Sequence, residues 1–515
     1  MMGTYWHPVP KTTTARIPRL GTRGFGVRAR VGAFLCCLVS LATEGAMPNP
    51  ASAQEVSAPV RQYRGLWVDA FHDGFKTPAE TIELVEHARR NHINTLFIEV
   101  RKVGDAYYRS KYEPAACDMA PGYDPLAHVL ALCHDTSRGK QPIEVHAWIV
   151  VYRLARSGVK LPSGHVFERQ PTWACLNRSG SKSQDNNLFV DPGVPGVIDH
   201  TAAVVADLVH KYDIDGIHLD YIRYPGEEWG YNSIALKRFS RLTGKSGRAP
   251  LPDDEIWSQF RRDQVTALVR RVYAVVKSIR TQVKVSVAAI ACGGPGRGGP
   301  ESDFHRSLTY RRYCQDWPAW LQEGIIDAMV LMNYKREDVA DEKQDYRDWV
   351  QFVTSQAQGR HVVIGQGGFL QHASLSLRQL RVAAQTPGIS GVVVYSYATP
   401  TRLSSEQPAF WGSLRSSLFE TAAPAPRAEW LDYPRRGILA GRVLSPAGDG
   451  VDGATVTLEG QDKRGLKTDG SGFYALANLP TGRYIISASA TGGKKAAISA
   501  IVTPGRVKNA NLTVR

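Results

Sequence analysis

The sequence predicts an α/β chain in which a closed (β/α)8 barrel is followed by a small all-β sandwich. Between residues 60 and 420, short runs rich in Val and Ile alternate with longer amphipathic segments. From residue 437 to 515 the pattern changes to alternation of apolar and small or polar residues, punctuated by turn residues, with no evident helix. Residues 421–436, rich in Ala and Pro, are expected to link the two domains.

Eight apolar runs are expected to form the strands of the barrel. Strand–helix alternation repeated in this way favours a closed parallel barrel over a doubly wound open sheet. An open sheet of that kind usually carries a glycine-rich phosphate turn after its first strand, and VDAFHDGF is not such a turn. The expected strands cover residues 63–71, 95–104, 144–153, 215–225, 284–294, 327–337, 361–369 and 391–398.

Two of the intervening helices carry clear start signals. Thr77 precedes Pro78 and stands three residues before Glu80, which is the spacing of a capping box. The segment 253–280 has the pattern of a long basic amphipathic helix that is opened by two acids. We expect a helix to begin at each of these places.

Residues 1–53 have the pattern of an export signal. A basic stretch leads into the apolar run Val31–Ala42, and Ala51-Ser52-Ala53 forms a small-residue cleavage site. The apolar run is shorter than the roughly 20 residues that span a bilayer. We therefore expect an exported protein, periplasmic, envelope-bound or secreted, without an integral membrane span once the signal is removed.

The charge and the cysteines limit the partners that we expect. The net charge of +15 falls to about +10 without the signal, and a moderately basic surface suits an anionic polymer. No Lys/Arg run or nucleic-acid motif appears, so nucleic acid is not an expected partner; the oligomeric state has no sequence signature. No metal or cofactor is expected, because no zinc-type spacing occurs among the five remaining cysteines, Cys117, Cys133, Cys175, Cys292 and Cys314.

Three carboxylates are the candidate catalytic groups, because catalytic residues of such barrels lie at the C-terminal ends of the strands. Glu99 lies inside IEVR and Asp220 inside HLDY, while Asp69 ends the first strand. A polar group buried without a partner costs several kcal/mol, so Glu99 and Asp220 are expected to face a shared polar cavity. The alternative is that Arg101 neutralises Glu99 in a structural ion pair.

Two carboxylates are what glycoside hydrolysis requires: one donates a proton to the leaving oxygen, and the other acts as nucleophile or base. Motifs of other hydrolases and of nucleotide binding, namely GxSxG, HExxH and GxxxxGK[ST], do not occur. The remaining polar and aromatic residues at the expected strand ends are candidate substrate contacts. They are Arg101, Asp105, His146, Trp148, Arg153, His218, Arg223, Asn333, Tyr334 and Tyr395.

The chain resembles the glycosyl-hydrolase-like family numbered ten. The stretches RGLWVDAF, VRKVGDAYYRSKYEP, VHAWIV, LFVDPGVPGV and YDIDGIHLDYIRYP carry this resemblance, which spans about residues 63–400 in matching order. The resemblance implies a TIM-like barrel that cleaves bacterial cell-wall or related glycans. The tail is similar to a carboxypeptidase-regulatory-like module, which implies a spacer or binding domain.

The resemblance also implies roles for individual residues. The stretch DGIHLDYIRYP matches the fourth-strand signature and places Asp220 at the main catalytic carboxylate position. Tyr221 stands where many members carry a second acid, and many carry Gln where this chain has Glu99, which favours Asp220 over Glu99. A looser similarity to chitinase-type barrels, through Met332–Tyr334, points to an N-acetylated sugar.

We therefore expect an exported glycoside hydrolase that cleaves an envelope or extracellular glycan with N-acetylated amino sugars. Asp220 is its expected core carboxylate, Glu99 or Asp69 its proton donor, and Trp148 and Tyr334 are expected substrate contacts. The alternative is a carbohydrate-binding barrel that has lost catalysis, which the Tyr221 departure favours.

Overall fold

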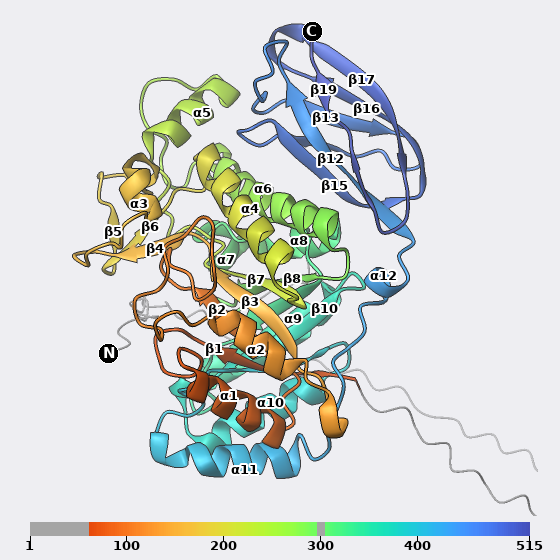
Figure 1. Ribbon diagram of the computed structural model, residues 1–515. Helices are drawn as coiled ribbons and strands as arrows, with labels where there is room; N and C mark the ends of the chain where they lie inside the picture. Colours follow the sequence, from red (N-terminus) through yellow and green to blue (C-terminus); the bar gives the residue numbers. More distant parts are fainter. Residues whose placement is uncertain (1–60, 296–303) are drawn as a thin grey trace, which may run out of the picture. The chain divides into compact units, whose positions relative to one another are not determined.

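The computed structural model describes residues 61–295 and 304–515, so the predicted export signal lies outside the described residues (Figure 1). Eight parallel strands close a barrel in the order β1-β11-β10-β9-β8-β7-β3-β2. Each lies inside one of the eight predicted strand segments, which confirms the predicted fold class. They are β1 (Tyr63–Val68), β2 (Thr95–Arg101), β3 (Glu144–Val150), β7 (Gly216–Asp220), β8 (Lys284–Ile290), β9 (Ala328–Met332), β10 (His361–Gly367) and β11 (Gly391–Tyr395).

Helices follow the barrel strands in sequence and cover the outside of the barrel (Figure 1). The longer ones are α1 (Pro78–Arg90), α2 (Pro125–Cys133), α4 (Pro195–Lys211), α5 (Ser233–Thr243), α6 (Glu255–Ile279), α9 (Ala340–Ser355), α10 (Ala373–Gln385) and α11 (Gln407–Ser417). The shorter ones are α3 (Val166–Arg169), α7 (Leu308–Arg311), α8 (Trp317–Glu323) and α12 (Glu429–Asp432).

The two predicted helix starts are present, one of them with a different cap. Thr77 Oγ1 accepts a hydrogen bond from the backbone N–H of Glu80 at 3.2 Å, as a capping residue should. The Glu80 carboxylate does not return to Thr77; it accepts from the N–H groups of Gly74 and Lys76 at 2.9 and 3.0 Å. Glu80 thereby also orders the β1–α1 loop. In α6, Asp254 caps the helix through the N–H groups of its first turn.

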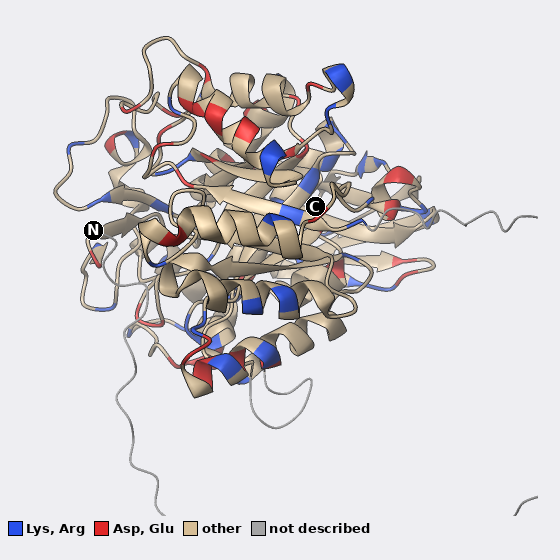
Figure 2. Cartoon of the chain, turned by 90° about the horizontal axis from the view of Figure 1, so that it is seen from below, with Lys and Arg blue, Asp and Glu red and all other residues tan. Residues whose placement is uncertain are grey.

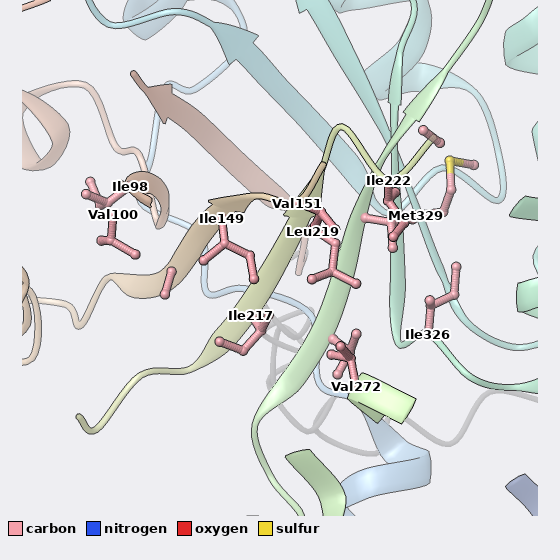
Figure 3. Close-up of a cluster of buried hydrophobic side chains, with 14 of the residues drawn as sticks. Ile98, Val100, Ile149, Val151, Ile217, Leu219, Ile222, Val272, Ile326 and Met329 are labelled. Carbon is pink, nitrogen blue, oxygen red and sulfur yellow. The ribbon is translucent and has the colours of Figure 1, made fainter. Parts of the chain in front are cut away.

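Alternate residues of the barrel strands pack into two separate cores. Side chains such as Ile98, Ile149 and Leu219 point outward and meet the helices (Figure 3). The other face of each strand points into the barrel, where aromatic and branched side chains form an inner cluster. The buried members of that inner cluster are Tyr63, Trp67, Phe97, Trp148, Val330, Val363 and Val393.

An excursion between β3 and α4 lies beside the C-terminal ends of the barrel strands. It contains α3 and a small sheet of β4 (Arg153–Arg156), β5 (Ser183–Gln184) and β6 (Asn187–Phe189), ordered β4-β6-β5. Backbone bonds tie it to the barrel: Val190 N–H donates to Tyr152 O at 2.9 Å, and Val151 N–H donates to Asp220 O at 2.8 Å. The excursion therefore carries Arg153 next to the end of β7.

The C-terminal residues form two small sheets that pack around their own core. One has the order β15-β12-β18, with β19 also pairing β12, and the other the order β14-β13-β16-β17. Leu439, Val456 and Ile486 belong to the apolar core between them. The strands are β12 (Arg436–Leu444), β13 (Thr455–Glu459), β14 (Gly465–Lys467), β15 (Phe473–Pro480), β16 (Gly482–Ser489), β17 (Lys495–Val502), β18 (Val507–Asn509) and β19 (Leu512–Thr513).

Ion pairs with low exposure join this β domain to the helices of the barrel. Arg238 of α5 donates from Nε and Nη2 to the two oxygens of Asp452, both at 2.8 Å. Arg271 of α6 donates to Asp469 at 2.6 Å, and Ala274 packs against Ala440 and Ala475. A bidentate Arg–carboxylate contact fixes orientation as well as distance.

The segment predicted as a linker is hydrogen-bonded to the N-terminal end of the barrel. The carbonyl of Ala423 accepts from Asn94 Nδ2 at 2.8 Å, just before β2. Trp430 of α12 donates from Nε1 to Asp327 Oδ1 at 2.7 Å, just before β9. Residues 421–432, which we call the floor segment, thus lie along the end of the barrel opposite to the predicted catalytic residues.

The surface has charges of both signs. Lys and Arg positions are interspersed with Asp and Glu positions on helices and loops, while the central strands carry few of either (Figure 2). All five cysteines of the described residues are free thiols, and Cys117 alone among them is exposed. Within residues 61–295 and 304–515, no helix has the length and apolar content needed to cross a membrane.

Candidate active site

Three buried carboxylates meet at the C-terminal end of the barrel. Asp69 directly follows β1, Glu99 lies in β2, and Asp220 is the last residue of β7. Their exposed fractions are 2%, 1% and 5%. The charges of Asp69 and Asp220 both act on Glu99 and raise its pKa, which shows that the three groups share one electrostatic environment. The structure therefore brings together all three predicted catalytic residues.

The pKa of Glu99 lies well above the ordinary value of a glutamic acid. Burial raises its pKa to about 8; Arg153 opposes this shift, and Asp69 and Asp220 add to it. Its Oε2 accepts a hydrogen bond from the N–H of Ala70 at 2.7 Å, which fixes the carboxyl group beside the end of β1. At neutral pH the folded protein holds Glu99 in its protonated form, which is the form that a general acid needs.

Asp220 and Asp69 are each held through one oxygen. Asp220 Oδ1 accepts from the N–H of Tyr221 at 2.6 Å and from Arg223 Nη1 at 3.5 Å. Asp69 Oδ1 accepts from His72 Nδ1 at 2.7 Å, and this hydrogen bond raises the pKa of His72. Asp69 Oδ2 is buried and has no hydrogen-bond partner within the described part of the chain. A buried carboxylate oxygen in this state is suited to receive a donor from a ligand.

Aromatic rings form the wall and base of the site. Trp67 contacts Tyr334 and Tyr395 with ring centroids 6.4 and 6.0 Å apart, and these two tyrosines are 5.6 Å apart. Trp148 lies 6.4 Å from Tyr395. Trp148, Tyr334 and Tyr395, all predicted substrate contacts, thus belong to one cluster. Flat apolar faces of this kind suit the apolar faces of sugar rings.

The interior of the barrel beneath the carboxylates is polar. Trp67 Nε1 donates to His218 Nε2 at 3.1 Å, and His218 Nδ1 lies 2.9 Å from Ser286 Oγ. His146 Nδ1 lies 2.9 Å from the same hydroxyl, and a Cβ at Gly216 would come within 2.4 Å of that ring. His218 and His146 are 0% and 1% exposed, so these two predicted substrate contacts lie inside the barrel beneath the carboxylates.

Arg101 lies on the opposite side of its strand from Glu99. A β-bulge shifts the register so that Glu99 pairs with Trp148 while Arg101 pairs with the outward-facing Ile149. Arg101 is fully buried and donates to Glu113 from Nε at 3.1 Å and from Nη2 at 2.7 Å. Its ion-pair partner is thus Glu113 rather than Glu99.

Two other predicted contacts are also engaged by the protein itself. Asn333 is fully buried and donates from Nδ2 to the carbonyl of Tyr346 on α9 at 3.0 Å. Asp105, in the loop after β2, accepts from the N–H of Val103 at 3.0 Å. Arg153 and Arg223, in contrast, lie close to the carboxylates. Arg153 opposes the rise in the pKa of Glu99, and Arg223 forms an ion pair with Asp220.

Three residues in or near the site, Trp67, Phe71 and Ser286, are not among the predicted site residues. Trp67 precedes Asp69 by two residues in a strand, so alternation alone places both side chains on the same face. Phe71 lies in the loop after β1 and is 37% exposed. Its position among charged side chains depends on loop geometry and has no counterpart in a sequence pattern.

Two cavities of the structure lie away from these carboxylates. One cavity of about 400 Å³ lies under the barrel, lined in part by Glu144, Lys284 and the floor segment. Another of about 680 Å³ lies between α1 and α11, lined by His87 and Trp411 among others. Neither contains a predicted site residue. No group of three or more metal-ligating side chains occurs in the part of the chain that the structure describes.

Comparison with known proteins identifies both domains. A model of the family described as glycosyl hydrolase-like 10 matches residues 62–370, and one of the carboxypeptidase regulatory-like domain matches residues 438–515. The glycosyl hydrolase YngK of Bacillus subtilis is 24% identical over 375 residues, which are 68% of this chain and 69% of the relative. The glycosyl hydrolase DigH of Escherichia coli O6:H1 is 24% identical over 358 residues, 62% of this chain and 77% of the relative.

A solved structure, the PgaB (BpsB) glycoside hydrolase domain from Bordetella bronchiseptica, is similar at 13% identity with a TM-score of 0.47. The similarity covers 72% of this chain and 100% of that one. The family match alone covers more than half of the present chain. The chain therefore belongs to the glycosyl hydrolase-like 10 family and carries a carboxypeptidase regulatory-like domain at its C-terminal end.

Proposed function

We propose that this protein is an exported glycoside hydrolase that cleaves an envelope or extracellular glycan containing N-acetylated amino sugars, such as peptidoglycan-type strands. Membership of a glycosyl hydrolase-like family, with relatives named glycosyl hydrolases, supports hydrolysis of a glycosidic bond. The observation that carries the proposal is Glu99, a buried acid that keeps its proton at neutral pH beside two further carboxylates.

In the proposed reaction Glu99 gives its proton to the glycosidic oxygen as the bond from that oxygen to the anomeric carbon breaks. The carboxylate of Asp220 faces the positive charge that develops on the sugar ring. Water then supplies the hydroxyl group at the anomeric carbon, and its released proton restores the acid. Asp69 accepts a sugar hydroxyl through its buried and unpartnered Oδ2.

The aromatic cluster supports an N-acetylated sugar. Trp148 Nε1 is a buried donor without a hydrogen-bond partner among the described residues. The carbonyl oxygen of an acetamido group is an acceptor that would satisfy it, and the acetamido methyl group would lie against the rings of Tyr334 and Tyr395. A sugar with a bare hydroxyl group offers no matching methyl.

Export is supported by the pattern of residues 1–53, with a basic stretch, a short apolar run and small residues at 51–53. Cleavage after Ala53 would leave Gln54 as the first residue of the mature protein. Edman or mass-spectrometric determination of the N-terminus of the protein recovered from outside the cytoplasm tests this. Recovery of the uncut chain from the cytoplasm alone would contradict it.

A digest tests the activity. Wild type, Glu99→Gln and Asp220→Asn are incubated with peptide-free peptidoglycan strands and with chitin oligomers, and saccharide products are read by mass spectrometry. The control is Glu459→Gln, an exposed residue of β13. We expect products from wild type and control and a loss of about 10²–10⁴-fold in Glu99→Gln. Binding of these glycans without any product from wild type would instead select the carbohydrate-binding barrel.

A further inference from the structure

A row of alternating cations and aromatic rings crosses the C-terminal end of the barrel, which we call its mouth. The Arg156 guanidinium carbon lies 5.5 Å from the Phe71 ring centroid, and that of Arg153 lies 5.2 Å from the same ring. Arg153 and Arg223 approach the Tyr221 ring to 4.4 and 4.3 Å. These separations are within the range of cation–π contacts. We call these five residues the cationic row; they come from the β1–α1 loop, from β4 and from the loop after β7.

The row runs from solvent to the catalytic carboxylates. At its inner end, Arg223 meets Asp220 at 3.5 Å, and Arg153 is 5% exposed and acts on Glu99. At its outer end, Arg156 is exposed and Phe71 is 37% exposed. The Arg156 guanidinium has no hydrogen bond or ion pair within residues 61–295 and 304–515.

The charges at the mouth do not cancel. The row supplies three guanidinium charges, from Arg153, Arg156 and Arg223. Of the nearby acids, Glu99 is neutral at pH 7, and Asp69 is already paired with His72. Arg223 lies next to Asp220. A further cation, Lys102, lies 5.4 Å from the Phe71 ring, and Asp118 pairs with both Lys102 and Lys76.

We propose that the outer end of the cationic row, Arg156 with Phe71, is a subsite for a carboxylate-bearing sugar of the glycan. Phe71 offers its exposed ring to a sugar face, and Arg156 binds the carboxylate through charge-assisted hydrogen bonds. This inference rests on the proposed function, because it states that the glycan cleaved at the three carboxylates is itself acidic.

The test compares two forms of one polymer. Peptide-free peptidoglycan strands, in which one of the alternating sugars carries a carboxylate, are used as such and after conversion of that carboxylate to its amide. Dissociation constants and kcat/KM are measured for both forms at low salt. The proteins are wild type, Arg156→Gln, Arg156→Lys and Arg415→Gln. Arg415 is an exposed arginine of α11, away from the mouth and also without a side-chain partner among the described residues, so it serves as the matched control.

We expect wild type and Arg415→Gln to prefer the carboxylate form by about tenfold, the scale of one charge-assisted hydrogen bond. Arg156→Gln should bring this ratio close to one, and Arg156→Lys should restore part of it. A ratio in wild type that is close to one, or a ratio that Arg156→Gln leaves unchanged, would overturn the inference. Preferential binding lost in Arg156→Gln, without cleavage by wild type, would support the subsite and reject the proposed hydrolysis.

Discussion

Trp67 Nε1 donates a 3.1 Å hydrogen bond to Nε2 of His218, and this contact sets the direction of a hydrogen-bond chain through the barrel. Because Nε2 accepts, the neutral ring of His218 carries its proton on Nδ1 and donates to Ser286 Oγ at 2.9 Å. Burial lowers the pKa of His218 well below its usual value, so the ring stays neutral. Ser286 Oγ in turn donates to the carbonyl of Ile217 at 3.3 Å and lies 2.9 Å from His146 Nδ1.

Removing the hydroxyl at the centre of this chain should destabilise the barrel. In Ser286→Ala, the Nδ1 atoms of both His218 and His146 lose their partner inside a closed core. We expect a decrease of about 1–3 kcal/mol in the free energy of unfolding. Urea unfolding measures it, with Ser355→Ala, an exposed serine of α9, as the control. Equal stability of the two variants would mean that water or a rearranged side chain replaces the hydroxyl.

The pH profile should report the acid Glu99. Its pKa of about 8 in the folded protein predicts that kcat/KM on a cleaved glycan falls about tenfold per pH unit above that value. Arg153 favours the ionised form of Glu99, so Arg153→Gln should raise the pKa further and move the alkaline limb to higher pH. The position of the limb is the readout, whatever the absolute rate. A limb that moves to lower pH would contradict the assignment.

The same acid should make stability depend on pH. Between pH 4.5 and 8 the folded protein keeps the Glu99 proton, whereas the unfolded chain releases it. The wild type should therefore lose up to about 1.4 kcal/mol of unfolding free energy per pH unit, relative to Glu99→Gln, as the pH rises through this range. Thermal unfolding at pH 5, 6.5 and 8 compares the two, with Glu459→Gln as the control. A stability difference that stays constant with pH would show that Glu99 is ionised when buried.

The contact between barrel and β domain should depend on Asp452. Asp452→Ala leaves the Arg238 guanidinium, whose side chain is 7% exposed, without its bidentate partner. Loss of one partner of a buried pair costs about 3–5 kcal/mol, so we expect the β domain to unfold in a separate, earlier transition. Scanning calorimetry shows this directly. Asp449→Ala, an exposed position in the same domain, should keep the wild-type profile.

The strands of the barrel could be predicted because each one is an uninterrupted apolar run between turn signals. All eight runs contain a strand, although the predicted segments extend a few residues past the strand ends into the loops. Asp69, Glu99 and Asp220 could be found for the same reason, since each is an acid that lies inside such a run or at its end. That they lie together follows from the parallel arrangement, in which all C-terminal ends share one side.

The direction in which other side chains point could not be predicted from strand position alone. Arg101 is two residues from Glu99 and should share its face, but the bulge between them reverses its direction. His146 and Trp148 point to the same side of β3, yet they occupy different depths of the barrel, because two residues of a strand are roughly 6.6 Å apart along it. The cationic row depends on loop conformations. One of them is the left-handed backbone of Tyr221 at φ 50°, which could not be predicted because residues other than glycine rarely adopt it.

The floor segment has a consequence for where the barrel domain ends. Trp430 and Ala423 hydrogen-bond to residues that precede two barrel strands, so a barrel ended at residue 420 would have an open base. Asp327 would then lose the indole donor while staying buried against Lys277. The barrel and the floor segment therefore form the unit that we expect to fold by itself, and this unit ends beyond residue 432.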